Sequence, residues 1–257
     1  MAATILQLTD PHIGANWAPG DPVDTLRAVL EVVRGLPQRP DVALLTGDLT
    51  AGGDEEDYAR LAAVIREELV VPLHVLPGNH DDRAALRRHF DVGGQGGESI
   101  QYPIELEGLR ILMLDTTIPG GEAAGDLDGE RLDWIGGELA ARPEVPTVLA
   151  MHHPPFLTGV PGMDCYALAD DARDAIARLI ADHPQVCGTI AGHVHKTMNT
   201  ILGGRPSMTA PSTYCQLQLD FEKPTLAMVP EPIGFALHRL VETRLVSYAR
   251  TLPVTAA

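Results

Sequence analysis

Four short apolar segments of this chain are each followed, within a few residues, by a polar side chain that can bind a ligand. Continuous apolar runs of this length are typical of buried strands, and here they are Thr4 to Leu8, Val42 to Leu45, Leu73 to Leu76 and Thr147 to Met151. The polar residues that follow them are Asp10, Asp48, Asn79 and His152. In an open α/β sheet, ligand sites gather beyond the carboxyl ends of the strands. We therefore expect these four side chains, which are far apart in the sequence, to converge.

Helical patterns alternate with the strand-like segments, which predicts an α/β fold. One helix is expected to begin at Asp24, because apolar residues then recur at helical spacing through Val33. Further helices are predicted from about residue 54, at 128–141 and at 171–181, and further strands at 109–114 and 186–191. Segments 199–221 and 233–252 are typical of short strands joined by turns.

The length and composition fit one large domain. The chain has 257 residues, of which 45% are apolar, so it can bury a sizeable core. We expect a single domain over 1–257 whose part from about residue 199 is rich in β-strands. Small cap loops are predicted at 91–100, where Gly93 to Gly97 is glycine-rich, and at 157–170, where the connection overhangs the expected site.

The acidic balance of the chain excludes some classes of partner. There are 35 Asp and Glu residues against 19 Lys and Arg, which gives a formal net charge of −16. Duplex nucleic acid and anionic membrane surfaces attract basic faces, so neither is an expected partner. A small anionic substrate stays compatible with the charge, because bound metal ions reverse the sign of a pocket locally.

The cysteines and the apolar runs bear on the compartment. The three cysteines have no CxxC spacing, which indicates free thiols in a reducing compartment, and they are Cys165, Cys187 and Cys215. No segment approaches the length of a membrane span, and the N-terminus lacks the pattern of a signal peptide. We therefore expect a cytoplasmic protein.

Five polar blocks stand in order along the chain. They are Asp10-Pro11-His12, Gly47-Asp48, Gly78-Asn79-His80-Asp81, His152-His153-Pro154-Pro155 and Gly192-His193-Val194-His195. Residues i and i+2 of an extended segment point the same way, so Asp10 and His12 can bind one ion. His193 and His195 can do the same with two imidazoles. Each block alone is a weak signal, but all five together at predicted strand ends indicate a metal site.

The remaining ligand types fit a pair of cations. Asp48 has two carboxylate oxygens and can bridge two ions, and Asn79 adds an amide oxygen without adding charge. A glycine directly precedes Asp48, Asn79 and His193, and glycine lets the backbone turn sharply and approach closely. Oxygen and nitrogen donors without thiolate suit divalent ions such as Mn, Fe or Zn.

In this order the blocks resemble the pattern of the calcineurin-like metallophosphoesterase superfamily, which is D-x-H, G-D, G-N-H-D/E, H and G-H-x-H. The match runs from residue 10 to residue 195. Within the superfamily, the blocks most resemble the class III cyclic-nucleotide phosphodiesterases and the bacterial glycerophosphodiesterases close to them. The resemblance implies a four-layer α-β-β-α sandwich with two mixed β-sheets.

The resemblance also implies a role for each residue. The first metal would be held by Asp10, His12, Asp48 and His195, and the second by Asp48, Asn79, His152 and His193. His80 would be a histidine that faces the substrate and binds no metal. The implied cofactors are two divalent metal ions per chain, drawn from Mn, Fe, Zn and Co.

The expected activity is the metal-dependent hydrolysis of small phosphodiesters, such as 3′,5′-cyclic nucleotides or glycerophosphodiesters. A hydroxide between the metals would attack phosphorus, because coordination lowers the pKa of water towards about 7. Asp48 would hold both metals, and Asn79 and His80 would lie at the substrate. His80 would bind a phosphoryl oxygen or protonate the leaving alkoxide.

Two alternatives stay open at this point. One is a phosphomonoesterase or protein phosphatase on the same scaffold, but a doubly charged monoester usually calls for arginine clamps, and only Arg83 adjoins the blocks. The other is a non-catalytic scaffold protein, which should have lost ligands, whereas every expected ligand type is present. A homo-oligomer, dimeric or larger, is expected by analogy with related enzymes.

Other polar and aromatic residues have structural interpretations. His153 points away from the ligand side if its strand stays extended, so a supporting role is expected. Trp17 follows the first block and could lie near the pocket, but packing is the default interpretation. Asp81 and Asp82 are expected to open the next helix, with orientation of a ligand as an alternative role for Asp81. The histidines without partner spacing are expected to be structural or at the surface, and they are His74, His89, His183 and His238.

Overall fold

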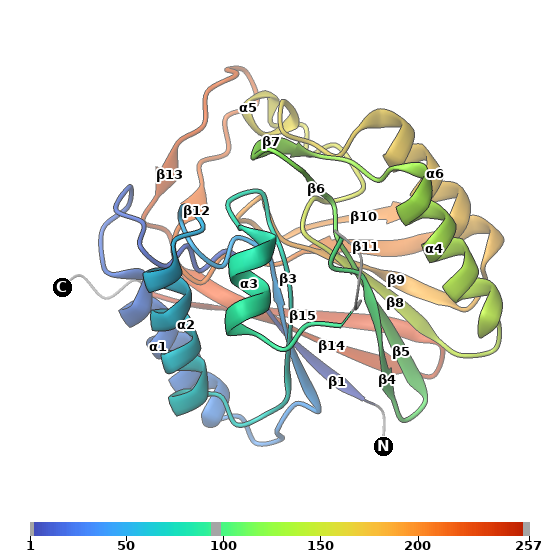
Figure 1. Cartoon of the computed structure of the whole chain (residues 1–257), viewed down its shortest axis with the longest axis horizontal. Coiled ribbons are helices and arrows are strands. Elements are labelled where there is room, and N and C mark those ends of the chain that lie inside the picture. The colour runs from blue at the N-terminus through green and yellow to red at the C-terminus, as the bar shows by residue number, and fades with distance from the viewer. Residues whose placement is uncertain (1–2, 94–98, 254–257) are drawn as a thin grey trace.

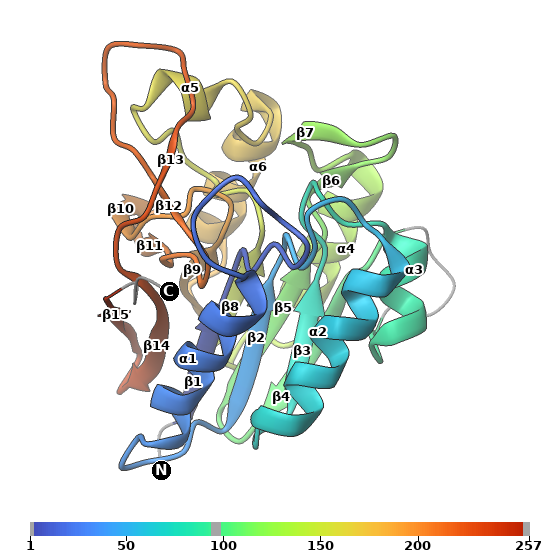
Figure 2. The ribbon, with the colours of Figure 1, turned by 90° about the vertical axis from the view of Figure 1, so that its left-hand side faces the viewer.

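Two β-sheets lie face to face at the centre of the molecule, and helices cover their outer faces (Figures 1 and 2). The computed structural model describes residues 3–93 and 99–253. Both sheets contain parallel and antiparallel neighbours, so the predicted α/β sandwich with two mixed sheets is confirmed. The prediction of a glycine-rich loop at Gly93 to Gly97 falls mostly outside the described residues.

The first sheet carries the N-terminal strands and has the order β15-β14-β1-β2-β3. Its strands are β1 (Thr4–Leu8), β2 (Val42–Thr46), β3 (Leu73–Leu76), β14 (Ile233–Val241) and β15 (Arg244–Leu252). β1, β2 and β3 are parallel, so their carboxyl ends meet at one edge. The helices on this side are α1 (Pro22–Arg34), α2 (Glu55–Glu68) and α3 (Arg83–His89).

The second sheet has the order β10-β11-β9-β8-β5-β4. Its strands are β4 (Tyr102–Leu106), β5 (Leu109–Leu114), β8 (Thr147–Met151), β9 (Val186–Ala191), β10 (Met198–Leu202) and β11 (Arg205–Thr209). β5, β8 and β9 are parallel neighbours. Two helices cover the outer face, α4 (Gly129–Ala141) and α6 (Asp170–Asp182).

Short elements surround the edge at which the parallel strands end. β6 (Thr117–Ile118) pairs with β7 (Glu122–Gly125), and β12 (Gln216–Leu217) pairs with β13 (Met228–Val229). The short helix α5 (Pro161–Asp164) lies in the predicted cap connection 157–170. In both ribbon views, α5 and the β12–β13 hairpin lie side by side above the sheets (Figures 1 and 2).

The period of two along β5 divides its side chains between two cores. Ile111 and Met113 face the first sheet and join the core between the sheets, whereas Leu112 and Leu114 face α4 and α6. Because both faces are covered, every residue of the strand is buried, and all of them except Arg110 are apolar. Burial on both faces thus explains why this segment shows no regular alternation of polar and apolar residues in the sequence.

One predicted helix start was wrong. The side chain that caps α1 is Asp21, whose carboxylate accepts from the backbone N–H of Val23, while Asp24 lies in the first turn. Pro22 is the first helical residue, where its missing N–H costs nothing, so the helix begins earlier than the apolar pattern indicates. Asp82 caps α3 through the backbone N–H of Ala85, as expected.

A search of the described residues finds no helix that combines the length and the apolar character needed to cross a membrane.

Candidate metal centre

The polar residues predicted to converge do meet at one edge of the sandwich. Each follows a strand directly: Asp10 and His12 follow β1, Asp48 follows β2, Asn79 follows β3, His152 follows β8, and His193 and His195 follow β9. Parallel strands from both sheets therefore deliver these side chains to one place, although the first and the last are 185 residues apart in a chain of 257. All except the half-buried Asn79 are buried.

The first group of donors consists of Asp10, His12, Asp48 and His195, whose ligand atoms all lie within 4.8 Å of one another. His12 Nε2 is 3.0 Å from His195 Nε2 and 3.5 Å from Asp48 Oδ2. His195 Nε2 is 3.5 Å from Asp10 Oδ1. Two carboxylates and two imidazoles thus surround one point.

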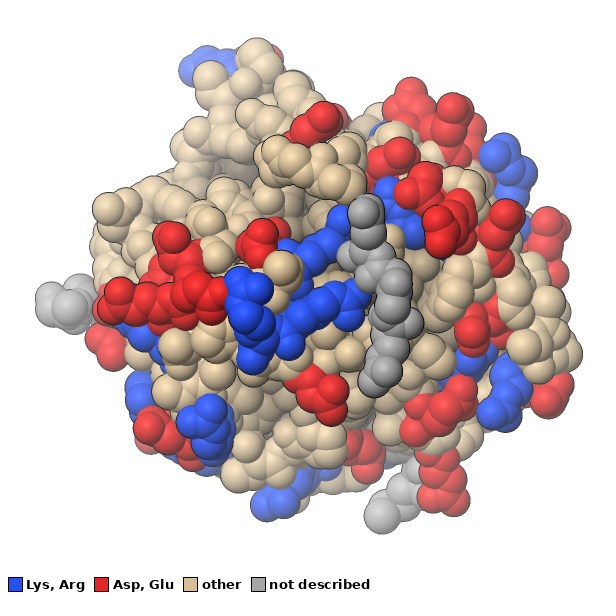
Figure 3. Space-filling view, in the orientation of Figure 1, with Lys and Arg blue, Asp and Glu red and all other residues tan. Residues whose placement is uncertain are grey.

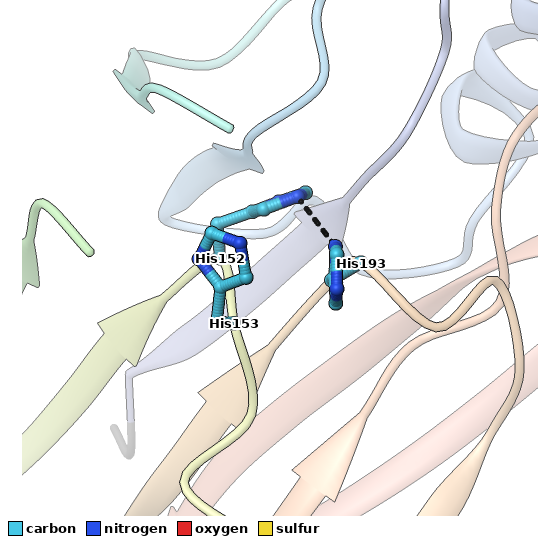
Figure 4. Close-up of side chains that lie close together, drawn as sticks. All are labelled: His152, His153 and His193. Atoms are coloured by element: carbon cyan, nitrogen blue, oxygen red, sulfur yellow. Dashed lines mark hydrogen bonds between the residues drawn. The ribbon is translucent and has the colours of Figure 1, made fainter. Parts of the chain in front are cut away.

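The second group lies beside the first and shares Asp48 with it. His152 Nε2 is 3.2 Å from Asn79 Oδ1, 3.2 Å from His193 Nδ1 and 3.4 Å from Asp48 Oδ2. The contact between His152 and His193 is the dashed line in Figure 4. The same oxygen of Asp48 therefore lies between the two groups, where a bridging carboxylate would lie.

Backbone carbonyls fix the orientation of three imidazoles. His152 Nδ1–H donates to Thr46 O at 2.8 Å, and His195 Nδ1–H donates to the carbonyl of Cys215 at 2.9 Å. His193 Nε2–H donates to the carbonyl of Tyr166 at 3.1 Å. Since a carbonyl only accepts, the nitrogen that faces the centre is in each case the one that can offer a lone pair. This is how metal-binding histidines are usually held.

The backbone at the centre is strained. Among the described non-glycine residues, only six have positive φ, and five of them belong to the predicted ligands. They are Asp10 (φ 51°), His12 (43°), Asp48 (52°), His193 (71°) and His195 (47°). This conformation is unfavourable for ordinary side chains and persists only where the surroundings impose it. At these five positions, the left-handed backbone conformation directs the side chain towards the centre.

Two glycines make room for the ligands. A Cβ at Gly78 would collide with the carboxylate and the backbone N of Asp48, and a Cβ at Gly47 would collide with the His152 ring. Gly47 also has a φ of 93°, which only glycine adopts readily. The glycines predicted to allow a close approach are therefore needed for steric reasons.

Charge at the centre separates the imidazoles into two classes. Burial lowers the pKa of His152, but Asp48 opposes this and raises it to about 9. Burial likewise acts against the charged form of His195, yet Asp10 raises its pKa well above the ordinary value. Burial lowers the pKa of His12 to about 3. In the metal-free protein, His152 and His195 thus hold protons that a cation must displace.

Asp81 has a larger role than the sequence indicates. Its carboxylate accepts from the backbone N–H groups of Gly78 at 2.9 Å and Leu49 at 3.1 Å, and from the Tyr58 hydroxyl at 2.8 Å. It therefore ties the loop with Asp48 to the loop with Asn79 and does not open α3. Burial and the nearby Asp48 raise the pKa of Asp81 to about 6.

His153 also lies against the centre, with a ring nitrogen within 4.8 Å of ligand atoms of His152 and His193, but both of its ring nitrogens have protein partners. Its ring centroid is 4.4 Å from that of His193 (Figure 4). Its Nε2–H donates to the carbonyl of Ala123 at 3.1 Å, and its Nδ1 accepts from the Thr116 hydroxyl at 2.8 Å. Because both ring nitrogens have protein partners, this geometry agrees with the supporting role expected from the sequence.

A cavity of about 350 Å³ opens above the centre. His80 lines it, with its ring edge-on to His12 at a centroid distance of 5.0 Å. His80 Nδ1–H donates to the carbonyl of Ala51 at 2.8 Å, and no described residue bonds to Nε2. Trp17 also lines the cavity and is 43% exposed, so the alternative expectation of a position near the pocket is confirmed over the default interpretation of packing.

The donor set fits divalent cations. Carboxylates and imidazole lone pairs that point at one another over 3.0–3.5 Å repel unless a proton or a cation lies between them. Hard oxygen donors mixed with imidazoles suit ions such as Mn, Fe, Co or Zn. In addition, His12 Nδ1 is buried without a hydrogen bond, as expected where metal binding and not hydrogen bonding fixes the ring.

Comparison with known proteins decides the family. The sequence profile of the calcineurin-like phosphoesterases matches residues 3–197. The chain belongs to this family.

Relatives within the calcineurin-like phosphoesterase family carry diesterase names. A probable glycerophosphodiester phosphodiesterase of Arcobacter nitrofigilis is 32% identical over 245 residues, which cover 93% of this chain and 89% of that protein. A cAMP/cGMP dual specificity phosphodiesterase of Mycobacterium tuberculosis is 32% identical over 81% of this chain and 67% of its own length. The family depends on divalent metals, and the geometry above provides two neighbouring groups of donors.

Two solved structures of phosphatases share the fold. A dimetal phosphatase from Danio rerio superposes with a TM-score of 0.69 at 18% identity and covers 99% of both chains. The purple acid phosphatase PPD1 of yellow lupin gives a TM-score of 0.73 at 15% identity, over 98% of this chain and 52% of that one. At these identities the likeness establishes the architecture alone.

Proposed function

We propose that this chain is a metal-dependent phosphoric diester hydrolase that acts on small phosphodiesters, such as 3′,5′-cyclic nucleotides or glycerophosphodiesters. The observation that carries the proposal is the shared position of Asp48 Oδ2, 3.5 Å from His12 Nε2 and 3.4 Å from His152 Nε2. A carboxylate placed between two sets of imidazoles suits a pair of metal ions in hydrolytic enzymes. The names of the relatives support diesters as the substrate class.

The proposed ligands divide into two sets that share Asp48. Asp10, His12 and His195 complete the first set. Asn79, His152 and His193 complete the second, in which His152 contacts the other two and Asp48. When bound, the cations would lower the pKa of coordinated water and neutralise charge on the phosphoryl oxygens. Two divalent ions and two carboxylates leave roughly +2 at the site, which attracts a phosphodiester despite the acidic surface.

His80 has the position of a substrate-facing group. Its Nδ1–H is held by the carbonyl of Ala51, which leaves Nε2 without a partner among the described residues. In the imidazolium form, the Nε2–H could contact a phosphoryl oxygen or be transferred to the leaving alkoxide, which would leave the neutral Nδ1–H ring. Its backbone N–H also donates to Asp48 Oδ1 at 3.0 Å, so the position of His80 is coupled to that of the bridging carboxylate. We assign substrate contact to His80 and Asn79.

The charges around the cavity favour diesters over monoesters. None of the described residues that line the cavity above the centre is Lys or Arg. Figure 3 shows basic side chains gathered on the face where α3 lies, but Arg83 is engaged there by both oxygens of Asp115, at 2.8 and 3.1 Å. A doubly charged monoester would therefore find no arginine clamp in the described lining of this cavity, although such substrates usually require one. Two arginines, Arg83 and Arg87, line the neighbouring pocket, which shares Asn79 and His80 with the cavity.

The test is a pair of model substrates after metal reconstitution. The chelator-treated protein is loaded separately with Mn, Fe, Co or Zn and assayed with bis-p-nitrophenyl phosphate and p-nitrophenyl phosphate. We expect the higher kcat/KM with the diester. A clear preference for the monoester would favour a phosphatase, and no turnover on either substrate with any metal would favour a scaffold protein.

Four further predictions stay open. The native metal is unassigned among Mn, Fe, Co and Zn, and the reconstitution series ranks these ions by activity. The expected homo-oligomer is tested by light scattering coupled to size-exclusion chromatography. The single domain over 1–257 is tested by a single cooperative unfolding transition that two independent probes report at the same midpoint. The expected cytoplasmic location is tested by cell fractionation.

A further inference from the structure

Apolar side chains form much of the wall of the cavity above the metal centre. Metal ligands and His80 make up its polar floor, whereas the apolar lining consists of Trp17, Ala123, Met163, Tyr166, Leu226 and Met228. The described lining contains no Lys or Arg. A phosphate bound at the floor would therefore extend one of its ester arms along apolar surface. Metal binding alone does not require these apolar side chains.

Trp17 is the part of the wall that most strongly indicates a ligand. Its side chain is 43% exposed, although a large aromatic residue in a loop is more stable when buried. The indole centroid lies 5.1 Å from that of His12 and 5.9 Å from that of His80. An exposed indole directly beside the centre offers its apolar surface to whatever occupies the cavity.

The loop that carries Trp17 is held in place from below. The backbone N–H of Ala18 donates to the Tyr214 hydroxyl at 3.1 Å, and that hydroxyl donates to the carbonyl of Ala18 at 2.8 Å. The Tyr214 ring packs edge-on against the indole at a centroid distance of 6.4 Å, and Tyr214 itself is buried. Trp17 is thus fixed before any ligand binds, which lowers the entropy cost of binding.

The rest of the wall is also attached to the centre. Met163 and Tyr166 come from α5 and the turn after it, and Leu226 and Met228 come from the β12–β13 hairpin (Figures 1 and 2). The hairpin packs closely on α5, because a Cβ at Gly162 would lie 2.8 Å from the Thr225 carbonyl carbon. The Tyr166 carbonyl accepts the Nε2–H of His193. The wall and the metal ligands therefore form one unit.

We propose that this wall selects phosphodiesters in which one ester arm carries a planar aromatic group, and that this group lies against the Trp17 indole. The inference rests on the proposed function and adds the chemistry of the arm. A nucleobase and an aryl ester share this chemistry, whereas a glycerophosphodiester with an ethanolamine arm lacks it. Stacking on an aromatic side chain tolerates different bases, because every base has a π-face.

The kinetic test compares substrates within each variant. For wild type, Trp17→Ala and Trp17→Phe, kcat/KM is measured with 3′,5′-cyclic AMP, bis-p-nitrophenyl phosphate and glycerophosphoethanolamine. We expect Trp17→Ala to lower the ratio of aromatic to aliphatic kcat/KM about tenfold, mainly through KM, and Trp17→Phe to restore most of it. Tyr248→Ala removes another exposed aromatic side chain, on β15, and should keep the wild-type ratio.

The two aromatic substrates distinguish the sources of the ring. A lower ratio with cyclic AMP alone assigns the wall to a nucleobase, and a lower ratio with the aryl diester alone assigns it to an aryl group. Unchanged ratios for both substrates in Trp17→Ala would overturn the proposal. Absence of turnover by the wild type on all three diesters would instead count against the proposed function.

A binding measurement tests the wall without turnover. Calorimetry on the metal-loaded protein compares adenosine 5′-monophosphate with ribose 5-phosphate, which has the same phosphate and sugar but no base. We expect the base to tighten Kd about tenfold in the wild type and to have almost no effect in Trp17→Ala. Equal tightening in both proteins, or none in the wild type, would contradict the assignment of Trp17.

Discussion

The two sheets of the sandwich contribute different chemistry to the same centre. The strands of the first sheet end in oxygen donors, Asp10, Asp48 and Asn79, with one imidazole, His12. The strands of the second sheet end only in imidazoles, His152, His193 and His195. Neither sheet has a complete set of ligands, so the centre exists only where the sheets dock.

The side-chain contacts that complete the centre join residues of one sheet to residues of the other. Asp48 faces His152 at 3.4 Å, and Asp10 faces His195 at 3.5 Å, so each pair joins a carboxylate of one sheet to an imidazole of the other. The backbone N–H of His193 also donates to Asp10 Oδ2 at 3.1 Å. Metal binding should therefore stabilise the fold as well as supply the chemistry.

The largest effect is expected from removing the carboxylate that both sets of ligands share. Asp48→Ala should lower diesterase kcat/KM about 10⁴-fold or more and release at least one metal ion, because metal charge stabilisation is worth several kcal/mol. Elemental analysis and steady-state kinetics measure the two effects. Asp133→Ala, which removes an exposed carboxylate in α4, is the matched control. Full metal content in Asp48→Ala would refute the bridging role.

The next largest effect separates chemistry from metal binding. His80→Ala should lower kcat about 10²–10⁴-fold if the imidazole is a general acid, while both metals stay bound. The control is His183→Ala, at the C-terminal end of α6. Wild-type kcat on a substrate with a poor leaving group would remove His80 from the mechanism. Loss of metal would show that His80 acts through the ligands.

A smaller effect is expected from the buried carboxylate that joins two loops of the first sheet. Asp81→Ala leaves the backbone N–H groups of Gly78 and Leu49 without an acceptor and should weaken metal affinity about 10–100-fold. Asp81→Asn keeps one acceptor oxygen, so its metal affinity should fall between those of the wild type and Asp81→Ala. Competition with a chelator of known affinity measures this.

The neighbouring residue provides the matched control for Asp81. Asp82→Ala removes only the cap of α3, which should cost about 1 kcal/mol of unfolding free energy and leave metal affinity unchanged. Equal losses of metal affinity in Asp81→Ala and Asp82→Ala would mean that general destabilisation explains both.

Much of this centre could be predicted from the sequence, because its ligands follow strands. β1, β3, β8 and β9 begin and end within a residue of their predicted bounds, and ligand positions relative to a strand end then follow from geometry. The role of Asp81, in the loop that follows β3 of the first sheet, could not be predicted in this way. Asp81 adjoins a helix start, and its sequence context is the same whether it caps the helix or turns back to the loops.

The apolar wall could not be predicted in the same way. Trp17, Tyr166 and Met228 come from a loop, a turn and a short hairpin, whose conformations depend on tertiary contacts such as the one between Ala18 and Tyr214. A single exposed tryptophan has the same sequence signature as a buried one. Strand β4 was also missed, because its alternation of buried and exposed residues covers only five positions.

A further prediction concerns a polar chain that joins the sheets beneath the centre. His238 Nε2–H donates to Gln7 Oε1 at 2.9 Å, and Gln7 Nε2 donates to the carbonyl of Ala191, in the other sheet, at 2.9 Å. Burial lowers the pKa of His238 to about 3, from an ordinary value of 6.5. Below pH 6.5 the unfolded chain takes up a proton that the folded protein does not, so stability is lost as the pH falls.

We expect His238→Gln to reduce this pH dependence by up to about 1.4 kcal/mol per pH unit between pH 6 and pH 4. Urea unfolding of both metal-depleted proteins across this range measures the slopes, and the difference isolates His238 from the other imidazoles. Identical slopes would mean that His238 accepts a proton in the folded state.

The most direct measurement of the central claim is a metal titration of chelator-treated protein. Diesterase activity and bound metal are followed together as Mn²⁺ is added. Since two neighbouring groups of donors share Asp48, activity should rise to a plateau at two ions per chain, and Asp48→Ala should not reach it. A plateau at one ion, or full activity in the metal-free protein, would contradict the account.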